Sequence, residues 1–265
     1  MANRRLSKTF LSISVLSATS EASSFPRANI VDRTSPQRAW RSTGIGSDHR
    51  VVIDLGATQT DITCYLDWVN FSSFKYQESA NGTSGWADIG SLRTVEPDDI
   101  TGVYRRVDNI TLSGKRYLGI YVPAQSTTDG ESYFRIGTFC VPVSIVELDA
   151  GTDISYPFEV AVLDSNIIVN QFPTGRNEKV KLGTLQPMII SFTVLTTVMQ
   201  NLSGDRVREI TDLFRDSTQT IFIDFNLSNT WQAYLCKKSG ELRASINAPH
   251  TGTGDFGTMI FEVVI

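Results

Sequence analysis

The segment GTGDFG at residues 252–257 has the glycine spacing of a loop that holds the pyrophosphate of a dinucleotide. Such a loop needs a strand before it and a helix after it, because the helix N-terminus meets the phosphates. Here a β-rich segment at 258–265 follows instead. The same six residues contain the Asp-Phe-Gly magnesium motif of protein kinases, but no catalytic or phosphate-covering loop accompanies it. The segment therefore predicts a glycine-rich turn that leads into a strand.

Other patterns that could support catalysis are weak. Asp98 and Asp99 follow Pro97 as a turn or helix cap, and no neighbour in the sequence would shift the pKa of either carboxyl group. The serine-hydrolase, zinc-protease and dithiol motifs are absent. The only histidines are His49 and His250, which leaves little for zinc or histidine-based chemistry. We therefore expect no enzyme, no cofactor and no bound metal.

A binding surface is the remaining chemical function. The loop from Tyr76 to Trp86 places two aromatic residues among Asn, Gly, Ser and Thr. This mixture presents flat apolar faces and adaptable hydrogen bonds to a sugar or a protein. Arg105 and Arg106 follow Tyr104 in the next strand region, so we expect Trp86 to stack on a ligand with one of these arginines as polar support. The alternative is that Trp86 opens a strand and packs in the core.

Composition restricts the class of protein. Among 265 residues, 41% are hydrophobic and 20% are charged, as in globular proteins, which excludes wholesale disorder. The net charge is −4 and basic residues are not clustered, which argues against a nucleic-acid binder. No apolar run is long enough to span a membrane. The chain length favours two domains of ordinary size.

The three cysteines predict buried thiols. Cys64, Cys140 and Cys236 are widely spaced, odd in number and set in apolar or alternating runs. We expect no disulfide among them, as for a protein that assembles in a reducing cytoplasm.

The N-terminal segment resembles a secretory signal, with basic residues before a moderately apolar stretch. Hydroxyl side chains at Ser12, Ser14 and Ser17 interrupt that stretch, and its alternation also suits a strand. We therefore expect residues 1–26 to form an arm that is ordered by contact with a neighbouring chain or with the second domain.

Residues 27–150 predict an antiparallel β-sandwich, because short strands follow one another between turn residues without helical periodicity. In the strand at 60–68, alternation predicts Ile62, Cys64, Leu66 and Trp68 on one face. A turn-rich break at 149–153 marks the boundary. Residues 151–265 predict an α+β domain, an antiparallel sheet with one helix that begins near Ser203.

The first domain resembles the discoidin-like, galactose-binding family of jelly rolls. The residues that carry this resemblance are PQRAWRS at 36–42, VVIDLG at 51–56, DIT at 61–63, NF at 70–71, RYLGIYV at 116–122 and FRIG at 134–137. The resemblance implies a jelly roll that binds carbohydrate, lipid headgroup or protein at loops on one end. Asn29 and Asp32 match the family's structural calcium loop only loosely, so no metal is expected from them.

The second domain resembles the tail-tip and distal-tail proteins of long-tailed bacteriophages. This resemblance rests on DRVREITDLFR at 205–215, TIFIDF at 220–225 and WQAYL at 231–235, and it covers about residues 157–265. It implies a helix, a short gap and then two strands of a sheet.

The leading functional hypothesis is a structural protein of a phage tail tip or baseplate, present in several copies in the virion and assembled in the host cytoplasm. Its partners would be other tail proteins, copies of itself and a host cell-surface glycan on the jelly roll. The alternative is a secreted carbohydrate-binding lectin or adhesin, which the signal-like start and five N-x-S/T sequons favour. A glycoside-hydrolase accessory module is a third reading, which the lack of a catalytic domain in the sequence disfavours.

Overall fold

The computed structural model describes residues 4–98, 102–148, 159–162, 167–171, 177–181, 188–193, 220–224, 230, 232–239, 245–248, 253–255 and 258–263. The chain divides into two compact units. The jelly-roll unit comprises Ser7–Ile145 and Asp224–Ala233, and the second unit comprises Met1–Leu6, Val146–Ile223 and Tyr234–Ile265.

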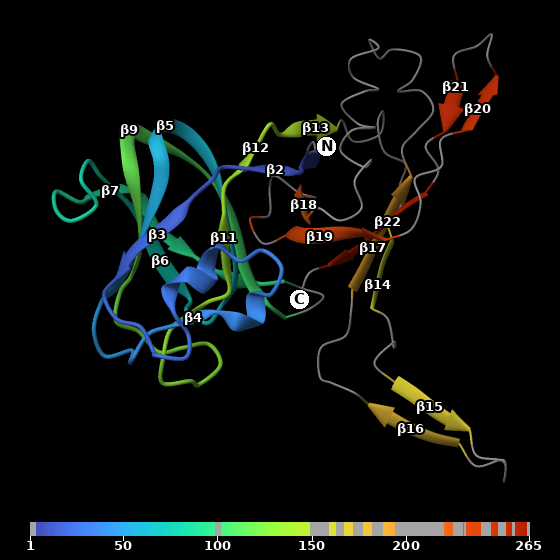
Figure 1. Ribbon diagram of the computed structural model, residues 1–265, viewed down its shortest axis with the longest axis horizontal. Coiled ribbons are helices and arrows are strands. Elements are labelled where there is room, and N and C mark those ends of the chain that lie inside the picture. The colour runs from blue at the N-terminus through green and yellow to red at the C-terminus, as the bar shows by residue number, and fades with distance from the viewer. Residues whose placement is uncertain are drawn as a thin grey trace. The chain divides into compact units, whose positions relative to one another are not determined.

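The jelly-roll unit is built on one large antiparallel sheet, in which the strands run in the order β11-β5-β9-β6-β7, with β3 also paired to β5 and β8 to β9. Its strands are β3 (Ser14–Ala18), β5 (His49–Val69), β6 (Ser73–Ser79), β7 (Ala87–Thr94), β8 (Glu96–Pro97), β9 (Tyr104–Val122) and β11 (Thr138–Cys140). Two small sheets accompany it: β4 (Trp40–Arg41) with β10 (Arg135–Ile136), and β2 (Thr9–Phe10) with β12 (Pro142–Val143). Figure 1 shows β5 and β9 as the longest strands of this unit.

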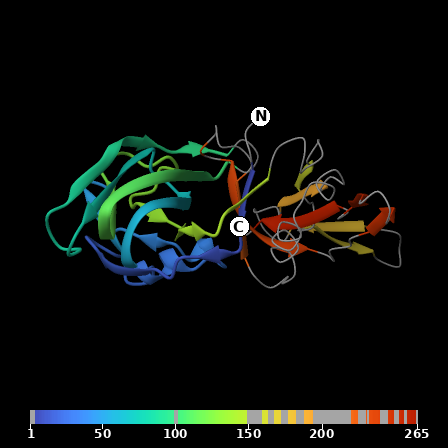
Figure 2. The same cartoon turned by 90° about the horizontal axis from the view of Figure 1, so that it is seen from above.

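The pairing of the long strands β5 and β9 is interrupted by irregularities, so the two ends of β5 pair with different strands. The pairing shifts between Asp54 and Gln59 and again between Asp67 and Val69. Such bulges bend a strand and increase its twist. The first part of β5 pairs with β3, and its last part pairs with β11. Figure 2 shows the blue N-terminal segment on one side of the unit and green strands on the other.

Apolar side chains from most of these strands form one core. Trp40 is fully buried in it and donates its indole N–H to the carbonyl oxygen of Ser20 at 3.1 Å, which satisfies the one polar atom of that side chain. Cys64, Cys140 and Cys236 are all buried and form no disulfide, in agreement with their predicted environment. Burial raises the pKa of the Cys64 and Cys140 thiols, which keeps both protonated at neutral pH.

Most of the N-terminal segment belongs to the jelly-roll unit rather than to a separate arm. β2 pairs with β12 and β3 pairs with β5, while Leu11, Ile13 and Val15 pack against the core. The cause is the alternation of apolar and hydroxyl residues, which gives this segment one side that can be buried. Only β1 (Arg4–Ser7) departs from this pattern, because it pairs with β13 (Val146–Leu148) of the second unit.

The described parts of the second unit are all strands. Its main sheet has the order β13-β1-β18-β19-β22-β17-β14, and two hairpins are formed by β15 with β16 and by β20 with β21. Beyond β1 and β13, these are β14 (Glu159–Val162), β15 (Ile167–Gln171), β16 (Asn177–Lys181), β17 (Met188–Thr193), β18 (Thr220–Asp224), β19 (Ala233–Ser239), β20 (Ser245–Ala248), β21 (Thr253–Asp255) and β22 (Thr258–Val263). The mainly β, antiparallel class is therefore confirmed.

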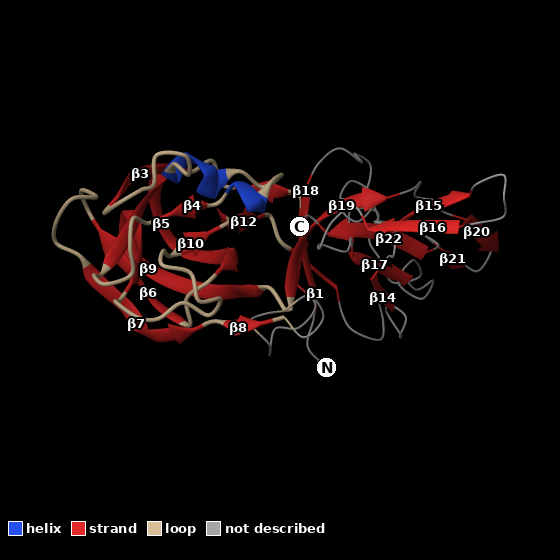
Figure 3. Cartoon of the chain, turned by 90° about the horizontal axis from the view of Figure 1, so that it is seen from below, coloured by secondary structure: helices blue, strands red, loops and turns tan. Residues whose placement is uncertain are grey.

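The helix predicted near Ser203 lies outside the described residues. The helices within them are the short 3₁₀ turns η1 (Arg27–Val31) and η2 (Pro36–Arg38), which Figure 3 shows in blue. No helix in the described ranges has the length and apolar character to cross a bilayer. Of the glycine-rich segment at 252–257, residues 253–255 form the strand β21 rather than a turn, and β22 is the strand predicted to follow.

Candidate ligand-binding surfaces

Tyr76 is a core residue rather than a surface residue. Its side chain is 0% exposed and its ring packs edge-on against Phe74, with 4.9 Å between ring centroids. Burial raises the pKa of its hydroxyl group. The prediction that Tyr76 contacts a ligand therefore fails, because residue 76 faces inward in the alternation of β6.

Arg105 and Arg106 are also engaged within the protein. Arg105 is 2% exposed, and its Nε lies 3.4 Å from a carboxylate oxygen of Asp67, which is equally buried. Arg106 binds Asp108 through two hydrogen bonds of 2.7 and 2.8 Å. Both arginines lie near the start of β9, whereas Trp86 contacts Gly119 near its end. The structure does not bring the predicted partners together.

Trp86 is half-buried against the outer face of the large sheet. A Cβ atom at Gly119 would lie 3.0 Å from Cζ3 of its indole, so glycine leaves the space that the ring occupies. The guanidinium carbon of Arg50 lies 4.8 Å from the ring centroid on the same face. Trp86 thus combines the two predicted alternatives, since one part of the ring packs on the sheet and the remainder stays accessible.

Gly119→Ala tests this packing. We expect the free energy of unfolding to fall by about 1 kcal/mol, since the new methyl group crowds both Trp86 and the Arg50 stem at 3.3 Å. The measurement is urea unfolding of the full chain beside Gly44→Ala, where no atom lies within 4 Å of the added Cβ. Equal stabilities for the two variants would contradict the described contact.

The loop that precedes Trp86 is held by its own hydrogen bonds. The side-chain oxygen of Asn81 accepts the N–H groups of Thr83 and Ser84 at 3.0 and 2.9 Å. The hydroxyl of Ser79 donates to the Ser84 carbonyl at 2.6 Å and accepts from the N–H of Gly82. Gly82 has φ +72° and sits against Leu16 and Tyr117, a conformation and a space that suit only glycine. The loop is therefore ordered without a ligand.

A hollow of about 280 Å³ lies beside this loop. Its lining residues are Ser17, Ala18, Thr19, Arg50, Val52, Gly82, Thr83 and Trp86. Hydroxyl groups, an indole and one guanidinium group therefore surround the same space.

A second group of aromatic and basic side chains lies on the outward face of β4 and β10. We call it the Trp68 surface and define it as Phe25, Arg41, Trp68, Tyr133 and Arg135. Arg41 and Arg135 are direct partners across the ladder, so their side chains share a face. The neighbours Trp40 and Ile136 point the other way and are fully buried.

Trp68 reaches this surface through an unusual backbone conformation. Its φ is +60°, in the left-handed region that residues other than glycine seldom adopt. The residue lies in the bulge of β5, and its N–H donates to the side chain of Asp67 at 2.8 Å. Alternation predicts Trp68 on the same face of the strand as Leu66, which is fully buried. The bulge instead places Val69 in the core and leaves Trp68 half-buried.

Strain of this kind concentrates at functional sites. The close approach of Gly137 leaves no room for a side chain under Trp68, since a Cβ there would lie 2.5 Å from Cβ of Trp68. The glycine and the bulge together determine where the indole lies.

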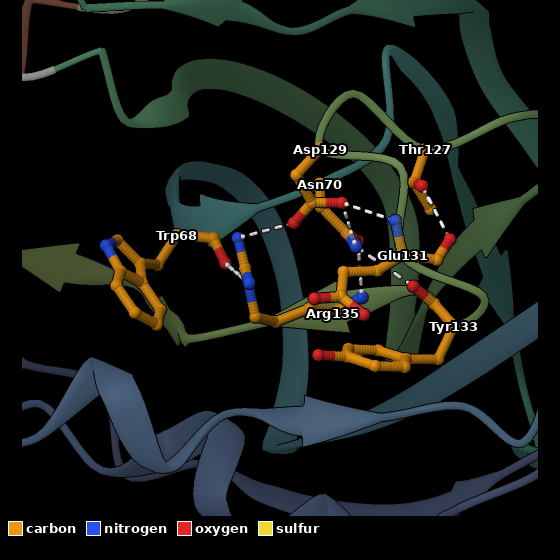
Figure 4. Close-up of polar contacts among 7 residues, drawn as sticks. All are labelled: Trp68, Asn70, Thr127, Asp129, Glu131, Tyr133 and Arg135. Carbon is orange, nitrogen blue, oxygen red and sulfur yellow. Dashed lines mark hydrogen bonds and ion pairs between the residues drawn. The ribbon is translucent and has the colours of Figure 1, made fainter.

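Arg135 is held against Trp68 by a set of polar contacts (Figure 4). Its guanidinium carbon lies 4.7 Å from the Trp68 ring centroid, and Nη2 lies 3.2 Å from Asp129. Asn70, which is fully buried, donates to Asp129 at 3.1 Å and to the Tyr133 carbonyl at 2.9 Å, and its oxygen accepts the N–H of Arg135 at 2.7 Å. Asn70 therefore ties the end of β5 to the segment 129–135.

Arg41 lies between two aromatic rings. Its guanidinium carbon is 3.6 Å from the Phe25 ring centroid and 4.7 Å from that of Tyr133. Within the described part of the chain, it forms no ion pair with a carboxylate. The two aromatic rings hold this cation in place.

No cluster of three or more metal-ligating side chains occurs in the described ranges. Of the loosely matching calcium residues, Asp32 accepts the N–H and hydroxyl of Thr34 at 2.8 and 2.6 Å. Its carboxylate therefore closes a local turn.

The large antiparallel sheet and its two short companions define the first unit as a β-sandwich of the jelly-roll type. No protein-family model matches the sequence, and no curated protein matches it. Solved structures with similarity include a chitosan-binding module of a Paenibacillus chitosanase/glucanase, with 22% identity and a TM-score of 0.37 over 51% of this chain and 97% of that one.

Two further solved structures are similar over about half of the chain. The C-terminal domain of a Bacteroides fragilis chitobiase has 18% identity and a TM-score of 0.40, covering 54% of this chain and 99% of that one. The module CBM32-3 of a Clostridium perfringens family 31 glycoside hydrolase has 14% identity and a TM-score of 0.39, covering 49% and 90%. Similarities of this size assign no ligand to this chain.

Proposed function

We propose that the jelly-roll unit is a carbohydrate-binding module and that the Trp68 surface contacts the glycan. The observation that carries this proposal is the left-handed conformation of Trp68, which turns a large apolar ring out of the core next to Arg135, the cross-strand partner of Arg41. A pyranose ring has an apolar C–H face that an indole can cover, and guanidinium donors can reach its hydroxyl groups.

The arrangement also favours binding because it is already ordered. Asp129 and Asn70 fix Arg135, and Phe25 and Tyr133 fix Arg41, so little side-chain entropy is lost when a ligand binds. The role we propose is binding without catalysis. The carboxylate of Asp129 supports this, because it is occupied by Arg135 and Asn70 instead of facing a substrate as an acid or base.

This function corresponds to the carbohydrate-binding alternative derived from the sequence. The more specific hypothesis, a tail-tip or baseplate component with tail proteins and further copies as partners, has no support among the described residues and stays a prediction. The same holds for the helix of an α+β second domain and for a location in the virion.

We expect Trp68→Ala to weaken glycan binding by about tenfold or more, as for an aromatic hot spot. The assay is a screen of the full chain on an array of neutral and acidic glycans, followed by calorimetric titration with the best ligand. The melting temperature should change little, because Trp68 is half-buried outside the core and alanine, which also has a Cβ, adopts the same positive φ at a similar cost.

Leu92→Ala is the control, since Leu92 is an exposed apolar residue of β7 that belongs neither to the Trp68 surface nor to the lining of the hollow beside Trp86. It should keep wild-type affinity. A chain that binds no glycan, or one whose binding survives both Trp68→Ala and Tyr133→Ala, would overturn the proposed function.

A further inference from the structure

The hollow beside Trp86 has features of a second ligand site, separate from the Trp68 surface. We propose that it binds an acidic monosaccharide unit, a sugar ring that carries a carboxylate, with Arg50 as the carboxylate partner. The argument rests on the hydrogen-bonding state of Arg50, on the charge of the lining and on the chemistry of the walls.

The guanidinium group of Arg50 is held in place by one hydrogen bond, from its Nε. Its Nε donates to the side-chain oxygen of Gln77 at 2.8 Å, and the Gln77 amide donates in turn to Asp88 at 2.7 Å. Its guanidinium carbon lies 4.8 Å from the Trp86 ring centroid and 5.6 Å from that of Tyr121. In the described part of the protein, its two terminal nitrogens donate no hydrogen bond. A planar guanidinium with both terminal nitrogens unused matches the two oxygens of a carboxylate.

Arg50 is also the single charged residue among those that line the hollow. Two carboxylates on this face, those of Asp88 and Asp48, already have partners. Asp88 accepts from Lys75 and Gln77, both at 2.7 Å. Asp48 accepts from the hydroxyl of Tyr121 and from the N–H of Ala124. The lining itself is therefore positive, which selects an anionic ligand over a neutral one.

The remaining walls suit a sugar rather than a simple anion. Trp86 offers the accessible part of an indole, and Ser17 and Thr83 add exposed hydroxyl side chains. At about 280 Å³, the space is slightly smaller than the pockets that hold drug-sized ligands, so it admits one sugar ring rather than a longer segment. The loop that contains Gly82 and Thr83 is fixed by Asn81 and Ser79, so the site is formed before a ligand arrives.

Methyl β-D-glucuronide and methyl β-D-glucoside test the site, because they differ only in a carboxylate against a hydroxymethyl group. We expect saturable binding of the glucuronide to the full chain in an NMR or calorimetric titration, and binding at least about tenfold weaker for the glucoside. Arg50→Gln should remove this preference. Thr83→Val removes a hydroxyl group and leaves Arg50 in place, so it should weaken the binding of both glycosides by a smaller factor.

Arg116→Gln is the matched control. Arg116 lies on β9 of the same sheet. It is paired with Asp54 through hydrogen bonds of 2.7 and 2.8 Å and does not line the hollow. It should bind the glucuronide as the wild type does. Melting temperatures of both arginine variants verify that each remains folded.

Three results would overturn the inference: equal affinity for the two glycosides, no saturable glucuronide binding, or unchanged preference in Arg50→Gln. The inference is also distinguishable from the proposed function of the Trp68 surface. If glucuronide binding is lost in Trp68→Ala and Arg135→Gln but kept in Arg50→Gln, the acidic sugar binds the Trp68 surface and the hollow beside Trp86 is not its site.

Discussion

Gly137→Ala is expected to lower the free energy of unfolding by about 3 kcal/mol and to abolish glycan binding at the Trp68 surface. The added Cβ would lie 2.5 Å from Cβ of Trp68, 2.8 Å from the carbonyl oxygen of Pro36 and 3.1 Å from that of Asp67. None of these atoms is the end of a flexible side chain, so a change of rotamer cannot relieve the clash. The bulge of β5 and the turn η2 must move instead, and Trp68 moves with them.

Gly46→Ala is the control, because an added Cβ there has no atom within 4 Å. Chemical unfolding gives the stability difference, and a glycan titration gives the binding difference. A Gly137→Ala protein with wild-type stability would show that the contact between residue 137 and the Trp68 bulge is looser than described. If Gly137→Ala is destabilised but keeps wild-type glycan affinity, the position of the Trp68 bulge does not determine binding.

Arg105→Met is expected to cost about 3 to 5 kcal/mol of stability, because it leaves the carboxylate of Asp67 buried without its cationic partner. Both side chains are at most 3% exposed, and the Nε–Oδ1 distance is 3.4 Å. Glycan binding per folded molecule should be unchanged. This outcome separates the role described by the structure from the ligand contact predicted by the sequence.

The loss should depend on pH. Burial raises the pKa of Asp67 in the folded protein, while Arg105 opposes that shift. Without Arg105, the pKa of Asp67 rises further. A carboxyl group whose pKa is raised by folding favours the folded state when protonated, and this contribution is lost as pH rises through the folded-state pKa. The variant should therefore be most impaired at neutral pH and recover partly on acidification.

Urea unfolding at several pH values measures this effect. Arg106→Met is the comparison, since Arg106 is paired with Asp108 and is the more exposed of the two arginines at 13%. Arg106→Met should lower the free energy of unfolding by less, and this loss should depend less on pH. A pH-independent loss in Arg105→Met, or reduced binding at unchanged stability, would contradict a structural role for the buried pair.

The sequence predicted the β-sandwich well because its evidence is local. The short apolar run at 51–55 and the turn residues between strands depend on near neighbours, and the structure places these segments in β5 and its partners. Alternation over residues 60–68 also placed Trp68 on the face of Leu66, and this prediction was wrong. The bulge that turns it outward depends on Gly137, which is distant in the sequence, and no local pattern reports that contact.

The candidate site was harder to predict for the same reason. Arg105 reads as an exposed basic residue, yet its burial depends on pairing between β5 and β9 that places it opposite Asp67. The role of Arg50 beside Trp86 likewise depends on Gln77 in β6. Trp86 itself was identified from loop composition, because an aromatic residue among small polar residues is a local signal.

Arg50 and Trp68 lie on one continuous strand, β5. The separation of the two proposed sites is therefore set by a hydrogen-bonded backbone rather than by a loop, and it is at most roughly 60 Å, the extended length of that stretch. A polysaccharide with acidic units at a matching interval could occupy both sites at once and gain avidity from their high effective concentration. Short oligosaccharides would bind each site singly, so affinity should rise steeply once the chain is long enough to bridge them.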